Sequence, residues 1–83
     1  SSIMGFAIDE RTIAFGEIGL GGEVRSVSHI AQRLKEAQRM EFTTCIVPKQ
    51  SLKSIDTSSY SMNVIGVSNI KQAFEVIKKG SND

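Results

Sequence analysis

Short apolar runs separated by turn residues predict the first elements of the chain. Residues 12–18 are rich in β-branched and aromatic side chains, which predicts a strand. Residues 19–22 include three glycines, which adopt turn conformations without steric cost, and residues 23–27 predict a second short strand. We therefore expect an antiparallel β-hairpin with a glycine-rich connection. Residues 1–9 show no clear period.

The next segment has the spacing of an amphipathic helix. Ser28 is a good N-cap, because its hydroxyl can accept a hydrogen bond from a free N–H of the first turn. From there to about Met40 most residues are strong helix formers. Ile30, Leu34 and Ala37 fall at i, i+4 and i+7, so we expect them to share one face.

Two strands and a polar loop are expected after this helix. Residues 43–47 predict a strand that ends at Pro48, and the lack of polar alternation after Thr44 favours burial on both faces. Residues 50–62 are polar and predict a loop. Residues 63–67 predict another strand.

A second helix is expected last. Either Ser68 or Asn69 would cap it, and Ile70, Phe74 and Ile77 repeat at i, i+4 and i+7. This spacing places the three apolar side chains on one face, which would pack against the sheet.

The order hairpin, helix, strand, loop, strand, helix predicts a small α/β (α+β) domain with helices covering a sheet. We expect a single unit over residues 1–83, with its core at about residues 12–79. Gly80 is expected just past the end of the last helix, and residues 80–83 predict a frayed tail.

Length and composition limit the classes of protein that fit. With 83 residues there is room for one small domain. Ten Lys and Arg against nine Asp and Glu leave a formal charge of +1, so net charge alone favours no polyanionic partner. The single Cys45 excludes an internal disulfide framework, and the single His29 disfavours a histidine metal site. No apolar run approaches the roughly 18 residues of a membrane span, and we expect a cytoplasmic, reducing setting.

Four groups of residues are candidates for chemistry, and each also has a structural interpretation. Residues 19–22 lack the lysine of a P-loop and the spacing of a dinucleotide-binding motif, so a structural turn is favoured. Cys45 lies in an apolar strand, which favours a buried inert thiol, and His29 is more typical of a surface or packing residue than of a base. Glu17 and Glu23 flank the turn and could share acid–base work, but nothing supplies a matching nucleophile or metal.

Basic residues are the remaining candidates. Lys35 and Arg39 share a face of the predicted helix, and Arg25 lies near a strand end. Together such residues can form a patch that binds phosphates with strong salt dependence, whereas charge counts alone favour a solvated helix face. The candidates are Arg25, Arg33, Lys35, Arg39 and Lys49.

Four segments together carry a resemblance to a known family. They are residues 15–25 (FGEIGLGGEVR), 30–37 (IAQRLKEA), 46–49 (IVPK) and 64–69 (VIGVSN). Their combination resembles the C-terminal, Lon-protease-like domain of the RadA (Sms) family of bacterial DNA repair proteins. The resemblance covers nearly the whole chain, and each segment alone is weak.

The resemblance implies a fold and a function that the residues alone do not show. RadA proteins combine a zinc finger, a RecA-like ATPase core and this domain, form hexamers on DNA and act in branch migration of recombination intermediates. Their Lon-like domain has the fold of the second domain of ribosomal protein S5 and is a non-catalytic scaffold and DNA-contacting surface. The chain would then be a piece of such a protein with no cofactor of its own, since ATP, magnesium and zinc are implied only for the parent.

One position argues against peptidase activity. Active Lon proteases use a Ser–Lys dyad, and Ala31 stands where the resemblance places the lysine. A methyl group cannot deprotonate a serine, and the dyad serine would precede residue 1. A Lon-like domain of a ComM-type ATPase and a generic protein-binding α/β module are the alternatives.

The resemblance also identifies partners and departures. The five basic residues become candidates for contact with DNA or with neighbouring copies, and exposed sheet edges predict that the chain self-associates. The family often has Pro where Ser26 stands and Gly where Glu41 stands. Glu41 would therefore lack the easy left-handed helix end that glycine offers.

Overall fold

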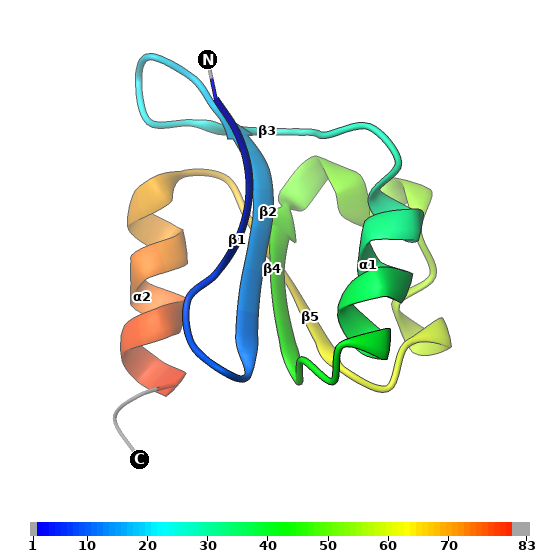
Figure 1. The fold of residues 1–83 in the computed structure, drawn as a ribbon. Coiled ribbons are helices and arrows are strands. Elements are labelled where there is room, and N and C mark those ends of the chain that lie inside the picture. Colours follow the sequence, from blue (N-terminus) through cyan, green and yellow to red (C-terminus); the bar gives the residue numbers. More distant parts are fainter. Residues whose placement is uncertain (1, 81–83) are drawn as a thin grey trace.

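Successive side chains of the central strand β4 (Thr44–Pro48) face opposite sides of the sheet. Cys45 belongs to an apolar cluster with α1 (Ile30–Arg39), and Ile46 belongs to a second cluster with α2 (Ile70–Gly80). The sheet therefore lies between the two helices (Figure 1). The computed structural model describes residues 2–80. Gly80 was predicted to lie just past the last helix and to begin a frayed tail, but it is the last residue of α2; the rest of that predicted tail, residues 81–83, lies outside the described residues.

One mixed sheet of five strands forms the middle layer. The spatial order is β1-β2-β4-β5, and β3 pairs with β2. The β1–β2 and β2–β3 pairs are antiparallel, whereas β2–β4 and β4–β5 are parallel. The remaining strands are β1 (Ser2–Ala7), β2 (Thr12–Ile18), β3 (Val24–Arg25) and β5 (Asn63–Val67). The predicted α/β class and hairpin are confirmed, although β3 is shorter than predicted.

The first strand is an element that the sequence pattern did not reveal. β1 pairs with β2 from Ser2 opposite Ile18 to Ala7 opposite Ile13. The connection is fixed by Asp9, whose Oδ1 accepts the backbone N–H groups of Arg11 and Thr12 at 2.8 Å each. The sheet therefore includes residues that precede the core expected at about residues 12–79.

Each face of the sheet has its own core. The cluster on the α1 side consists of Ile13, Phe15, Ile30, Leu34, Ala37, Cys45, Val47 and Met62. The cluster on the α2 side contains Ala14, Val24, Ile46 and Val67, against which apolar residues of α2 pack. β4 is buried on both faces, as predicted, because helices cover both sides of this parallel strand.

The first helix buries the predicted face but begins and ends differently. Ile30, Leu34 and Ala37 are all buried. His29, rather than Ser28, occupies the N-cap position; it has φ 60° and makes no side-chain capping bond. Ser28 stands one residue too early, so its hydroxyl does not cap the helix.

The C-terminus of α1 is closed by a Schellman motif. The N–H of Phe42 donates to the carbonyl of Ala37 at 3.2 Å, and that of Glu41 donates to Gln38 at 3.0 Å. Glu41 has φ 71°, the left-handed conformation that favours glycine. The expected cost of a glutamate at this position therefore has a structural basis.

The face of α2 that packs on the sheet is rotated from the predicted one. Ile70 and Ile77 pack against the sheet as predicted, and Ala73 and Val76 join them there. Phe74 is 63% exposed, so its predicted place in the core is wrong. Asn69 is the cap, since its Oδ1 accepts the N–H of Gln72 at 2.8 Å.

No helix within residues 2–80 is long and apolar enough to cross a membrane.

The predicted loop after β4 contains two short 3₁₀ helices, η1 (Lys49–Ser54) and η2 (Thr57–Ser59). Leu52 and Ile55 pack against the α1-side core. Asp56 caps η2 by accepting the N–H of Ser58 at 3.1 Å. This segment thereby places Lys49 directly at the carboxyl end of β4.

Candidate nucleic-acid interface

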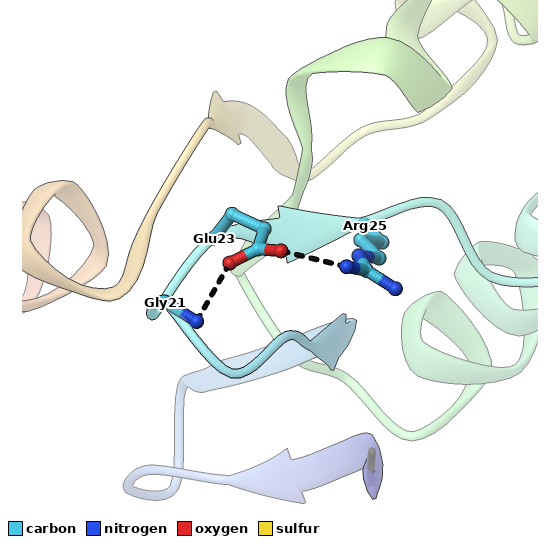
Figure 2. A network of polar contacts seen from close by, with 3 residues as sticks. All are labelled: Gly21, Glu23 and Arg25. Carbon is cyan, nitrogen blue, oxygen red and sulfur yellow. Dashed lines mark hydrogen bonds and ion pairs between the residues drawn. The ribbon is translucent and has the colours of Figure 1, made fainter.

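The β2–β3 turn is held by its own hydrogen bonds. The Glu23 carboxylate accepts the N–H of Gly21 at 3.0 Å and an N–H of the Arg25 guanidinium at 2.7 Å (Figure 2). The N–H of Gly22 donates to Gly19, and the N–H of Gly19 donates to the Glu23 carbonyl. All three glycine N–H groups thus have internal acceptors, so the structural-turn interpretation is supported over a phosphate cradle.

Close approach explains why glycines occupy this turn. A Cβ atom at Gly19 would overlap the Glu23 carboxylate, and Gly22 has φ 84°. The turn is also tied to α2, because the N–H of Ile70 donates to the Gly22 carbonyl at 2.9 Å. These contacts fix the Glu23–Arg25 pair at one end of the sheet.

The two carboxylates that flank the turn do not form an acid–base pair. The strand register places Glu17 opposite Arg25, and the backbone of Glu23 lies two residues away, opposite Gly19. The pKa of Glu23 is lowered by hydrogen bonds from its own backbone N–H, from Arg25 and from Gly21. A lowered pKa keeps the carboxylate ionised, which is the opposite of what a general acid needs.

Two of the predicted basic residues line one cleft. Arg25 from β3 and Lys49 from η1 border a depression of about 260 Å³, together with Glu23, Val24, Gln50, Val67 and Ser68. The cleft lies at the carboxyl ends of β4 and β5, where open α/β sheets commonly bind ligands. The Arg25 side chain is 56% exposed, so its ion pair with Glu23 is solvated and open to exchange.

The other three candidates lie on α1. Arg33 Nε donates to the Ser28 carbonyl at 3.1 Å, and Arg39 pairs with Glu36 at 3.6 Å. Arg33 lines a different depression of about 340 Å³ with His29, Gln32 and Glu36. Lys35 is exposed. The structure therefore brings Arg25 and Lys49 to one cleft, whose lining does not include Arg33, Lys35 or Arg39.

Sequence reasoning missed the polar neighbours of the cleft. Gln50 accepts a hydrogen bond from the Ser26 hydroxyl at 3.2 Å, and Ser68 follows β5. Both residues stand just beyond the carboxyl ends of strands that the sequence predicted, but the signal becomes usable only once the structure shows that these strands are parallel.

Cys45 and His29 have the structural roles that their sequence context favoured. Cys45 is fully buried, and burial raises the pKa of its thiol to about 11. A thiol that stays protonated is not a nucleophile. His29 is exposed at the start of α1. Within residues 2–80 no three or more His, Cys, Asp or Glu side chains gather in a group that would hold a metal ion.

Comparison with known proteins gives a consistent set of relatives. The chain is 48% identical over 64 residues, 77% of its length, to the DNA repair protein RadA of Streptococcus pneumoniae. It is 45% identical over 64 residues to RadA of Halalkalibacterium halodurans and 33% identical over 78 residues, 93% of its length, to RadA of Chlamydia pneumoniae. These matches span only 14% to 17% of each relative. No family model matches the chain.

Proposed function

Because the chain belongs to the RadA family of DNA repair proteins and matches only a small part of its relatives' length, we propose that it is a non-catalytic module of such a protein. Its proposed tasks are DNA contact and assembly with other copies during branch migration, in the cytoplasm of a bacterium. Its α/β architecture is compatible with a Lon-protease-like fold, which we include in the proposal.

The cleft formed by Arg25 and Lys49 is the observation that carries the DNA-contact proposal. Two cations from segments 24 residues apart meet at one end of the sheet, and Gln50 and Ser68 supply further polar groups there. Phosphate groups are recognised by such combinations of cations and neutral donors. A near-neutral protein can therefore bind DNA locally despite its small net charge.

The absence of catalysis in this module is proposed from the chemistry of its side chains. Ala31, at the position that the resemblance assigns to the dyad lysine, is exposed in the first turn of α1. The Tyr60 hydroxyl lies beside this residue and donates a hydrogen bond to the Ala31 carbonyl at 3.4 Å. An alanine here supplies no base. ATP hydrolysis and zinc binding are assigned, under the same proposal, to other parts of the parent.

Assembly is proposed from the edges of the sheet. In the described strands, β1 pairs only with β2 and β5 pairs only with β4. Each edge leaves backbone donors and acceptors for another strand. We propose that copies of the chain associate through these edges and that the parent assembles as a hexamer. Sedimentation of the chain over a range of concentrations tests this, and a monomer at every concentration would contradict it.

Titration of DNA over a salt series tests the DNA-contact proposal. The variant R25Q/K49Q should bind duplex DNA more weakly, with a slope of log K against log salt reduced by about 1.8, since each lost phosphate contact removes about 0.9. The control R11Q/K53Q removes the same charge from exposed residues outside the cleft.

Equal binding by the two double variants would overturn the cleft as the DNA-contact site. Absence of binding by the unmodified chain at low salt would overturn DNA contact altogether and favour a protein-binding module. Circular dichroism checks that both double variants remain folded, which the comparison of their DNA binding requires.

A further inference from the structure

The exposed Phe74 is the most unusual side chain on the surface of α2. It is 63% exposed, although the spacing of apolar residues favours its burial. Lys71 and Lys78 lie three residues before and four residues after it, so all three side chains follow one stripe of the helix. Both lysines are exposed. An aromatic ring thus stands between two cationic side chains.

We propose that this stripe of α2 binds single-stranded DNA, with a base stacked on the Phe74 ring and the adjoining phosphates near Lys71 and Lys78. The inference rests on the proposed DNA-contact function and adds the class of DNA. Alternating aromatic and basic side chains are the means by which proteins hold unpaired nucleotides. Bases of a duplex are already stacked inside the helix, so only an unpaired base can cover a projecting ring.

The charge of α2 favours a polyanion over an apolar partner. The helix carries three lysines against one glutamate, and all four side chains are exposed. Within residues 70–80, Glu75 is the one side chain whose negative charge would repel a phosphate. A partner that buried Phe74 through apolar contacts alone would also have to desolvate the neighbouring charges.

The Arg25–Lys49 cleft adjoins a second depression that borders α2. Lys49 and Val67 line the cleft and also line a second depression of about 330 Å³, whose other wall includes Gln72, Glu75 and Lys79 of α2. A strand that leaves the cleft would therefore reach α2 beside Lys79. The cleft binds phosphates of either DNA form, whereas Phe74 adds contact only to the unpaired form.

Fluorescence offers a direct test, because the chain has no tryptophan. The variant F74W would carry the sole indole, and a stacked base should quench it. The matched control is M40W, since Met40 is 60% exposed and lies at the end of α1. An oligothymidylate of about 15 nucleotides should quench F74W at saturation and leave M40W unchanged, and a duplex of the same length should quench neither.

Affinity of the non-aromatic variant F74L gives an independent readout. It should bind the oligothymidylate at least about fivefold more weakly and bind the duplex as the unmodified chain does. K71Q should lower the salt slope for the single strand by about 0.7, the value for one phosphate contact, and E75Q should strengthen that binding.

The outcomes separate this inference from the function on which it rests. If F74L binds the single strand as tightly as the unmodified chain while R25Q/K49Q weakens binding, single-strand stacking fails and DNA contact stands. If the unmodified chain binds neither DNA form at low salt, both fail. If F74L alters only self-association, the stripe is a protein interface and the inference is overturned.

Discussion

The Glu23 carboxylate holds the Arg25 guanidinium at 2.7 Å, directly beside the cleft that Arg25 shares with Lys49. The ion pair orients Arg25, but it also competes with any phosphate that approaches the same guanidinium. Glu23 therefore sets how much positive charge the cleft presents.

Replacing Glu23 by Gln should strengthen DNA binding. The amide can still accept the N–H of Gly21, so the turn is kept, while Arg25 becomes available to a phosphate. We expect the slope of log K against log salt to steepen by about 0.9. The control is E10Q, which removes the same charge at an exposed position in the β1–β2 turn. Equal effects of E23Q and E10Q would mean that only net charge matters.

The left-handed residue at the end of α1 predicts a stabilising change. Glu41 has φ 71°, so E41G should raise the free energy of unfolding by about 1 kcal/mol. Removing a negative charge from the negative end of the helix dipole should add to this gain. Urea denaturation followed by circular dichroism measures it. E41A is the control, since it removes the charge but not the strain, and a gain from E41A as large as that from E41G would refute the conformational explanation.

The helices α1 and α2 show how much of the fold could be predicted from the sequence. The sequence of α1 contains one apolar stripe, formed by Leu34 and the apolar residues at helical spacing from it, so its buried face was predicted correctly. In α2 apolar side chains cover more of the circumference, and the stripe through Phe74 was one of two choices. In the structure the stripe through Ala73 and Val76 packs against the sheet. The spacing of apolar residues alone does not reveal which of the two stripes is buried.

Long-range pairing explains the other differences. β1 has no alternation of its own, and its pairing with β2 defines it as a strand. The meeting of Arg25 and Lys49 follows from the parallel order of β2, β4 and β5, and local sequence patterns do not specify which strands become neighbours. His29 as N-cap has a φ of 60°, which is uncommon for residues other than glycine and which local sequence patterns do not predict, although histidine adopts it more often than most.

The buried thiol predicts resistance to alkylation. Cys45 is fully buried, and burial raises the pKa of its thiol to about 11, so very little reactive thiolate exists at neutral pH. Iodoacetamide should leave the folded chain unmodified for hours at a pH of about 8 and label it rapidly in urea, as mass spectrometry would show. S28C in a C45A background supplies an exposed thiol as the positive control. Rapid labelling of the folded chain would show that β4 opens locally.

Three loop carboxylates predict the direction in which stability changes with pH. Hydrogen bonds from the backbone of Arg11 lower the pKa of Asp9, and the Ser58 hydroxyl and N–H lower that of Asp56, both from an ordinary value of 3.8. The pKa of Glu23 is lowered from 4.5. A lowered folded-state pKa stabilises the fold above the ordinary value, and this contribution is lost as the pH falls through the folded-state pKa.

The melting temperature should therefore decrease as the pH is lowered from about 5 to below 3.8, and the triple variant D9N/E23Q/D56N should flatten much of this decrease. Circular dichroism melts at several pH values measure it. An unchanged decrease in the triple variant would assign the acid sensitivity to other carboxylates.

Gly66 links the packing of the sheet to the position of Lys49. A Cβ atom there would lie 2.5 Å from Leu52 Cδ1 and 3.1 Å from Lys49 Cα, so η1 would have to move away from β5. We expect G66A to lower the free energy of unfolding by about 1–3 kcal/mol and to weaken DNA binding, because Lys49 is displaced from the cleft. In the double variant G66A/L52A the overlapping side chain is gone, so its destabilisation should be smaller than the sum of the two single effects. Additive effects would show that overlap with the Leu52 side chain does not cause the destabilisation, and unchanged DNA binding by G66A would show that Lys49 keeps its place in the cleft.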